Sequence, residues 1–134
     1  MMKQGMTHEA TESLRPNVWV IDDEAPVRRT LSLLLERAGF GARSFESGDA
    51  ARRALESEGQ PEVVICDLNM PGRSGVAFLE TLRRQNHDVG IVVCSGDGTR
   101  RLPETCPDAT FLAKPFLPRE LLEAIDREMS QGVV

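Results

Sequence analysis

The chain has 134 residues, of which 40% are hydrophobic and 28% are charged, and its formal net charge is −5. This length fits one domain with a substantial core, and the negative charge disfavours electrostatic binding to nucleic acid or to anionic membranes. No apolar segment approaches the ~20 residues that a membrane-spanning helix needs. The polar first residues lack the apolar region of a secretory signal, so we expect a cytoplasmic location and no membrane contact.

The first half of the chain alternates apolar runs with segments of helical spacing. Residues 17–21 (NVWVI) predict a strand, and residues 26–38 predict a helix that starts near a proline and ends before a glycine. Residues 40–45 are a weaker strand candidate. A second helix is expected after Ser47, whose side chain can cap it, and Gly59 closes this helix.

The second half continues the same alternation. Residues 62–66 form a wholly apolar run that predicts a buried strand, and a third helix is expected from about Ser74. Residues 89–94 and the shorter run 109–113 predict the fourth and fifth strands. The last helix begins at Pro118 and carries apolar residues at intervals of four.

The segment between the last two strands departs from this pattern. It reads GDGTRRLPETCPD, and Pro103 and Pro107 interrupt any helix there. We therefore expect a fourth helix that is shortened or irregular. The three cysteines do not match a zinc pattern or a disulfide framework, so we interpret them as core residues: Cys66, Cys94 and Cys106.

Strands that alternate with helices predict a doubly wound α/β fold around a parallel sheet, in which ligands bind at the carboxyl ends of the strands. Polar residues end four of the five predicted strands at that edge. They are Asp22, Asp23, Asp67, Ser95 and Lys114. Each has an ordinary structural explanation by itself, but an arbitrary arrangement would scatter such residues over both ends of the sheet.

The chemistry of this set indicates phosphoryl transfer. Crowded carboxylates repel one another unless a cation joins them, and oxygen ligands at a hydrated edge suit Mg²⁺, with Mn²⁺ as a substitute. One Asp oxygen would remain free to attack phosphorus and form an aspartyl phosphate. A hydroxyl and an ammonium group nearby could hold the oxygens of the phosphoryl group.

Four motifs resemble the receiver domain of two-component response regulators, in a CheY-like single-domain form. They are VIDDE, ICDLNMPGRSG, VVCSGDG and FLAKPF, within residues 17–130. The resemblance implies a flavodoxin-like (βα)5 fold with the strand order 2-1-3-4-5. We expect a receiver domain over 16–130, with flexible tails at 1–15 and 131–134; the chain is either a complete single-domain receiver or a fragment of a longer regulator.

The resemblance also implies a role for each matching residue. Asp67 would be the phosphoacceptor, and Lys114 would contact the phosphate. Asp22 and Asp23, together with Asp67 and the backbone carbonyl of Asn69, would bind the Mg²⁺ ion.

Two further positions would form the switch. Ser95 would supply the hydroxyl that turns towards the phosphoryl group, and Phe111 would be the aromatic residue that moves between exposed and buried positions. A plain core role for Phe111 is an equal alternative. The Lys114-Pro115 peptide bond is expected to be cis, as is usual in the family.

The implied function is that of a phosphorelay receiver, not an enzyme beyond its own phosphorylation and dephosphorylation. The partners would be a sensor histidine kinase or a histidine phosphotransfer protein, an unknown downstream protein, and a second copy of the chain on phosphorylation, without direct nucleic-acid contact. One alternative is a pseudo-receiver that binds proteins without phosphorylation. A less favoured one is an Mg²⁺ phosphatase with an Asp nucleophile, whose DxDx[TV] motif this chain lacks.

Overall fold

The computed structural model describes residues 15–72, 74–86, 88–96 and 102–131. Its strands and helices alternate along the chain, as the sequence predicts. In order they are β1 (Asn17–Ile21), α2 (Ala25–Arg37), β2 (Gly41–Phe45), α3 (Gly48–Glu58), β3 (Val63–Asp67), α4 (Ser74–Gln85), β4 (Gly90–Ser95), β5 (Thr110–Ala113) and α5 (Pro118–Gln131). The last helix therefore extends one residue past the predicted domain end at 130. Of the predicted tails, 1–15 and 131–134, only Arg15 and Gln131 are among the described residues, and Gln131 is the last residue of α5.

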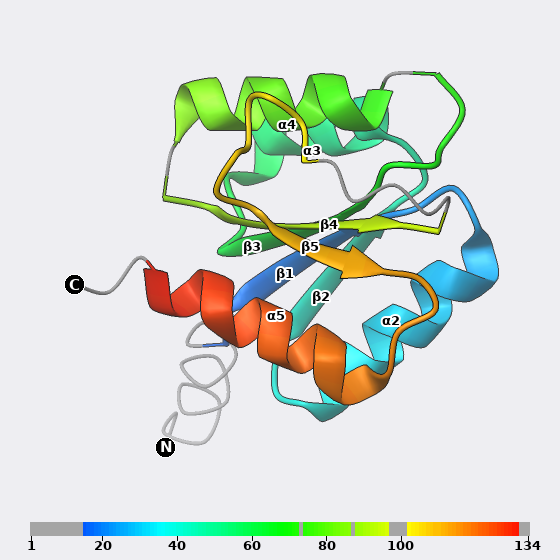
Figure 1. The fold of residues 1–134 in the computed structure, drawn as a ribbon. Helices are drawn as coiled ribbons and strands as arrows, with labels where there is room; N and C mark the ends of the chain where they lie inside the picture. Colours follow the sequence, from blue (N-terminus) through cyan, green and yellow to red (C-terminus); the bar gives the residue numbers. More distant parts are fainter. Residues whose placement is uncertain (1–14, 73, 87, 97–101, 132–134) are drawn as a thin grey trace, which may run out of the picture.

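The five strands form one parallel sheet in the order β2-β1-β3-β4-β5, which confirms the predicted flavodoxin-like topology. Figure 1 shows α3 and α4 on one face of the sheet and α2 and α5 on the other. Each crossover returns the chain to the same end of the sheet, so all five strands finish at one edge. That edge carries the polar residues selected from the sequence.

Alternating side chains along the strands build a core on each face. On β1, Trp19 and Ile21 pack towards α3 and α4, whereas Val18 and Val20 pack towards α2 and α5. Every residue of β3 and β4 is buried, which explains why these strands read as continuous apolar runs. The two central strands are consequently fixed from both sides.

Local sequence explains where two of the helices begin or end. The hydroxyl of Ser47 accepts a hydrogen bond from the Ala50 amide at 3.1 Å, so the predicted cap of α3 is confirmed. Gly39, just after α2, has a φ of 98°, a conformation that glycine adopts without strain. At the start of α4, the hydroxyl of Ser74 accepts a hydrogen bond from the Gly48 amide at 3.1 Å and so joins two helix starts.

The segment between β4 and β5 is irregular where the structure describes it. Residues 102–109 contain turns rather than a helix, in agreement with the prediction for this region. Residues 97–101 of the same segment lie outside the described residues. Within this segment the Cys106 amide donates to the Pro103 carbonyl at 2.9 Å, and the Cys106 side chain is buried in the core beneath α4. Ala109 and Leu102 of the same segment also pack against this core, so the irregular segment contributes three side chains to it.

The cysteines are buried and unbonded to one another, as expected of core residues. Burial raises the pKa of the Cys66 thiol far above its usual range, and it raises the pKa of Cys94 to about 12. Both thiols therefore stay protonated at neutral pH, which leaves little thiolate for metal binding or redox chemistry.

A buried glutamate on α5 fixes the far end of the sheet, and the sequence analysis did not single it out. Glu128 accepts a hydrogen bond from the Ile91 amide at 3.1 Å and another from the Thr110 hydroxyl at 2.5 Å. The pairing of β4 with β5 starts with Val92 opposite Thr110, so no carbonyl of β5 is paired with the Ile91 amide. The Glu128 carboxylate accepts the hydrogen bond of this amide in place of such a carbonyl. Its sequence signal was a charged residue on the apolar face of the last helix.

We predict that Glu128→Ala lowers the free energy of unfolding by about 1–3 kcal/mol, because a buried amide and a hydroxyl lose their acceptor. Glu128→Gln should cost less, since one acceptor oxygen remains. Urea unfolding followed by the fluorescence of Trp19, the sole tryptophan, measures both. The exposed Glu123→Ala is the matched control, and an equal effect of Glu123→Ala and Glu128→Ala would contradict the prediction.

Candidate functional site

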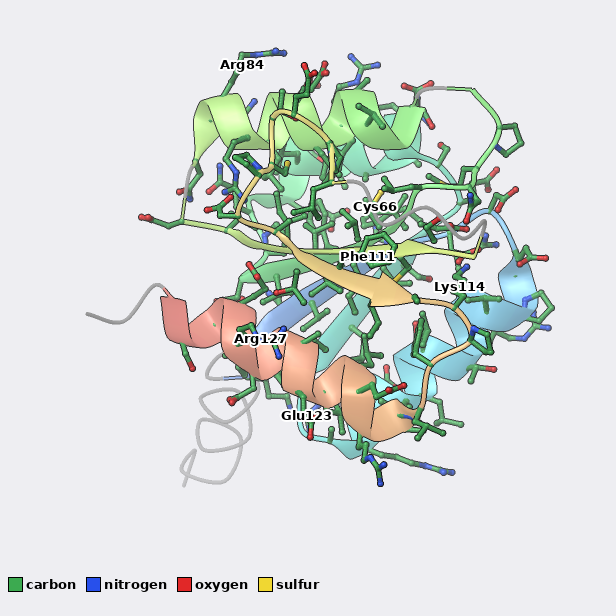
Figure 2. The ribbon with its side chains drawn as sticks, viewed as in Figure 1. Cys66, Arg84, Phe111, Lys114, Glu123 and Arg127 are labelled. Atoms are coloured by element: carbon green, nitrogen blue, oxygen red, sulfur yellow. The ribbon has the colours of Figure 1, made fainter. Side chains whose placement is uncertain are left out.

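The predicted polar residues meet at the carboxyl edge of the sheet. Asp22 directly follows β1, Asp67 is the last residue of β3, Ser95 is the last residue of β4, and Lys114 directly follows β5. Asp22, Asp67 and Ser95 are buried. Figure 2 shows Lys114 beyond the arrowhead of β5, at the same edge. The topology alone accounts for this convergence, because parallel strands end on the same side.

Three carboxylates form the acidic part of the site. Asp22, Asp23 and Asp67 each offer an oxygen, and these oxygens all lie within 4.8 Å of one another. Asp23 is exposed, whereas the other two are buried, so the cluster opens to solvent through Asp23. Carboxylates this close repel one another strongly at the rim of a low-dielectric core. An all-oxygen, partly hydrated set fits Mg²⁺, which keeps several waters and takes one or two carboxylates.

Lys114 compensates the two buried charges. Its Nζ lies 3.1 Å from an oxygen of Asp22 and 3.2 Å from an oxygen of Asp67. Burial by itself lowers the pKa of Lys114, but the hydrogen bond to Asp22 and the charge of Asp67 outweigh it, so the pKa lies above its usual value. The ammonium group is therefore charged at neutral pH and bridges the ends of β1 and β3.

Backbone contacts hold this lysine in place. The Lys114 amide donates to the Ser95 carbonyl at 2.9 Å, so the residue continues the pairing of β5 with β4. The following Lys114-Pro115 bond is cis, which confirms the prediction from the FLAKPF motif. The lysine side chain thus starts from a fixed point at the end of the sheet.

Asp22 is held by two contacts from α2 and the turn before it. The Glu24 amide donates to the Asp22 carboxylate at 2.9 Å, and the Arg28 guanidinium donates to the Asp22 carbonyl at 2.7 Å. Sequence reasoning missed Arg28. Its only signal was a basic residue in the first turns of the helix that follows the acidic pair.

Asp67 is oriented by the loop that follows it. The Asn69 amide donates to one Asp67 oxygen at 2.9 Å, while Lys114 occupies the other. The Leu68 amide donates to the Cys94 carbonyl at 2.9 Å, which ties the loop to β4. Both carboxylate oxygens of Asp67 therefore have partners, and the side chain points into the edge of the sheet.

The two predicted switch residues lie on neighbouring strands. Ser95 is paired with Ala113 at the end of the β4–β5 ladder, next to the strand that carries Asp67. Phe111 lies earlier on β5 and packs, partly buried, against the core beneath α3 and α4 (Figure 2). The structure thus brings Asp22, Asp23, Asp67 and Lys114 into one charged cluster, with Ser95 on the adjacent strand end and Phe111 outside the cluster.

Comparison with known sequences identifies the family. The response regulator receiver domain family matches residues 18–126. The chain is 33% identical over 118 residues to the phosphate regulon transcriptional regulatory protein PhoB of Escherichia coli, covering 84% of this chain and 51% of PhoB. It is 29% identical over 117 residues to the DNA-binding transcriptional regulator NtrC of Proteus hauseri, covering 85% of this chain and 24% of NtrC. The chain spans about half the length of PhoB and a quarter of NtrC.

Solved structures give the same result. A response regulator receiver domain protein from Clostridium thermocellum is 25% identical, with a TM-score of 0.76 over 87% of this chain and 95% of that one. The chemotaxis protein CheY4 of Vibrio cholerae is 26% identical, with a TM-score of 0.75 over 84% of this chain and 98% of that one. The likeness extends over almost the whole length of each of these two solved chains.

A doubly wound sheet with clustered carboxylates and a lysine at its carboxyl edge defines a signalling module of the phosphorelay class. The chain belongs to the response regulator receiver domain family of two-component systems. Such domains are signalling modules rather than conventional enzymes, and the comparisons favour neither the pseudo-receiver nor the phosphatase alternative. Nowhere in the described residues is a helix long and apolar enough to cross a membrane.

We predict that Mg²⁺ stabilises this protein and that Asp23→Asn removes the effect. Free Mg²⁺ at ten times its Kd should add about 1.4 kcal/mol to the free energy of unfolding. Without metal, the same variant should be more stable than the wild type by about 0.5–1 kcal/mol, because one repelling charge is gone. Thermal unfolding with and without Mg²⁺ measures both effects.

The matched control is Asp126→Asn, which removes an exposed carboxylate on α5. It should keep the full response to Mg²⁺. Equal stabilisation of Asp23→Asn and the wild type by Mg²⁺ would show that Asp23 is not needed to bind the ion, and no stabilisation of the wild type would contradict the metal site.

Proposed function

We propose that Asp67 accepts a phosphoryl group from a phosphohistidine of a sensor histidine kinase or phosphotransfer protein, or from a small acyl phosphate. The observation that carries this proposal is the shared lysine: Lys114 lies within 3.2 Å of both Asp22 and Asp67 at the strand ends. A cation already positioned beside the acceptor carboxylate can hold the oxygens of an incoming phosphoryl group after only a local shift of its contact.

The transfer forms one bond and breaks another. An oxygen of Asp67 attacks the phosphorus atom, and the bond from phosphorus to the imidazole nitrogen, or to the acyl oxygen of a small donor, breaks with its electron pair on the leaving group. Lys114 then shifts its contact from the carboxylates to a phosphoryl oxygen. Asp22 stays fixed by the Glu24 amide and Arg28, which keeps the acidic pair in place during the transfer.

We assign the metal site to Asp22, Asp23 and Asp67, with the backbone carbonyl of Asn69 as a further ligand. The clustering of the three carboxylates within 4.8 Å supports this assignment. Bound Mg²⁺, or Mn²⁺ in its place, would neutralise charge between the carboxylates and the phosphoryl oxygens.

The output of the proposed reaction is a change in population between two conformations. A phosphoryl group at Asp67 attracts the Ser95 hydroxyl across one strand spacing, and Phe111 occupies the space that Ser95 vacates. The partial burial of Phe111 in the resting structure supports a role at the margin of the core. A downstream protein, or a second copy of the chain, would bind the altered surface.

The remaining assignments follow from the family. We propose that residues 16–130 form the receiver unit, that it acts in the cytoplasm and that it signals through protein contacts without touching nucleic acid itself. The net charge of −5 supports the last point. PhoB and NtrC are named as transcriptional regulators, and this chain matches only part of each, so the nucleic-acid prediction concerns the residues of this chain alone.

Intact-mass measurement tests the acceptor. Incubation with acetyl phosphate and Mg²⁺ should give one phosphoryl adduct on the wild type and on the Asp126→Asn control, and none on Asp67→Asn. The adduct should not form when Mg²⁺ is chelated before acetyl phosphate is added. Absence of the adduct from the wild type, also with kinase as donor, would favour the pseudo-receiver, and sustained turnover of phosphate esters would favour the phosphatase.

Fluorine NMR tests the switch. In protein labelled with fluorophenylalanine, one of the five phenylalanine signals belongs to Phe111 and is assigned with Phe111→Leu. Beryllofluoride, a stable mimic of the phosphoryl group, should shift that signal in the presence of Mg²⁺. Ser95→Ala should bind beryllofluoride but show little of the shift. An unchanged shift in Ser95→Ala would show that the movement of Phe111 does not depend on the Ser95 hydroxyl.

A further inference from the structure

Arg28 reaches back from the start of α2 to the turn that carries the acidic pair. Its guanidinium donates to the Asp22 carbonyl at 2.7 Å, while its own amide donates to the Glu24 carbonyl at 3.1 Å. The Glu24 amide in turn donates to the Asp22 carboxylate at 2.9 Å. These three hydrogen bonds form a closed ring that joins the start of α2 to the end of β1.

The Asp22 carbonyl belongs to the peptide unit that connects Asp22 to Asp23. A peptide unit is planar, so a partner on this carbonyl fixes the orientation of the whole unit, including the Cα atom of Asp23. On the other side, the Asp22 amide donates to the Phe45 carbonyl at 3.1 Å. The backbone of Asp22 is therefore held at both its donor and its acceptor, and the contact from Arg28 sets the direction in which the chain continues to Asp23.

Asp23 depends on this backbone contact more than its neighbours in the acidic cluster do. The carboxylates of Asp22 and Asp67 are each held by a backbone amide and by Lys114. Asp23 is exposed, and among the described residues no hydrogen bond or ion pair holds its carboxylate. An oxygen of Asp23 nevertheless lies within 4.8 Å of oxygens of both other carboxylates. The backbone therefore places this carboxylate in the cluster.

We propose that Arg28 is a positioning residue for the metal site: through the peptide unit between Asp22 and Asp23, it holds the Asp23 carboxylate where it can bind Mg²⁺. This inference deepens the proposed metal site and rests on it. Such a role opposes simple electrostatics, because Arg28 should raise the affinity for Mg²⁺ although its own charge repels the ion. The two effects have opposite signs, so the direction of the change on mutation separates positioning from charge.

The size of the effect is limited by the exposure of the contact. Loss of a side chain that supports a metal ligand typically lowers metal affinity by about 10- to 100-fold. Arg28 is only partly buried, so water can replace part of its hydrogen bond to the carbonyl. We therefore expect a smaller loss of affinity, about 3- to 10-fold.

The test compares Arg28→Met with Arg29→Met. Methionine is unbranched like arginine and has a similar helix propensity, but it has neither the hydrogen-bond donors nor the charge. Arg29 is the exposed neighbour on α2, and in the described part of the chain it makes no hydrogen bond or ion pair through its side chain. The control variant therefore loses the same charge without losing the contact to Asp22.

The Kd for Mg²⁺ is measured by chemical-shift titration of the folded proteins. Arg28→Met should bind Mg²⁺ about 3- to 10-fold more weakly than the wild type, whereas Arg29→Met should bind it as tightly or slightly more tightly. A second readout is the nitrogen resonance of the Asp23 amide, which shares the peptide unit with the Asp22 carbonyl. This resonance should move in Arg28→Met and stay in place in Arg29→Met.

Each other outcome overturns the inference. An unchanged Kd in Arg28→Met, even with a lower Tm, would show that the contact supports only the fold. Tighter binding would show that Arg28 acts as a repelling charge, and equal weakening in both variants would show that the contact to Asp22 is not the cause. An unmoved nitrogen resonance of Asp23 would contradict the hold of Arg28 on this peptide unit.

Failure of this inference is distinguishable from failure of the proposed function. If Mg²⁺ neither stabilises the wild type nor shifts its resonances, the metal site itself is wrong, and the role of Arg28 falls with it. If the wild type binds Mg²⁺ and Arg28→Met binds it equally well, only the role of Arg28 is wrong. The assignment of Asp67 as acceptor is tested separately, by the phosphoryl adduct and its loss in Asp67→Asn.

Discussion

The site depends on one ammonium group shared by two buried carboxylates. Asp22 and Asp67 end neighbouring strands, and two buried negative charges that close together would be costly without compensation. Lys114 reaches both from the end of β5 and thereby makes the arrangement compatible with a folded protein. The same geometry leaves the acidic cluster ready for a second cation and leaves the lysine ready to move to a new anion.

The rest of the fold holds the strand ends that carry the site in fixed positions. β3 and β4 are buried on both faces, so the ends that carry Asp67 and Ser95 have little freedom to move. At the opposite end, Glu128 ties α5 to β4 and β5 through two hydrogen bonds. Rigid strands with a polar edge are therefore the structural basis of a site that works by positioning charge rather than by a strong nucleophile.

Much of this could be predicted from the sequence, because the signals were local. Apolar runs indicated the strands, Ser47 indicated a helix start, and residues that directly follow strands in a parallel sheet must share an edge. Asp22, Asp23, Asp67 and Lys114 could be brought together on that basis alone. The two prolines after β4 likewise indicated that no regular helix would form over 102–109.

Contacts between distant side chains could not be predicted in the same way. The contacts of Glu128 with Ile91 and of Asn69 with Gly96 depend on how a helix or a loop sits against another strand, which no local pattern records. Arg28 was missed for a related reason, because its partner is a backbone carbonyl. Cys106 was recognised as a core residue, but its packing together with Ala109 and Leu102 in the same core as residues of α4 appears only in the folded chain.

Borohydride reduction of the phosphorylated protein tests the central claim most directly. This reagent converts an aspartyl phosphate to homoserine, and peptide mass spectrometry then locates the modified residue. After treatment with acetyl phosphate and Mg²⁺, homoserine should appear at position 67 and at neither Asp22 nor Asp23. Homoserine at another carboxylate of the cluster, with position 67 unchanged, would contradict the assignment of Asp67 as the phosphoacceptor.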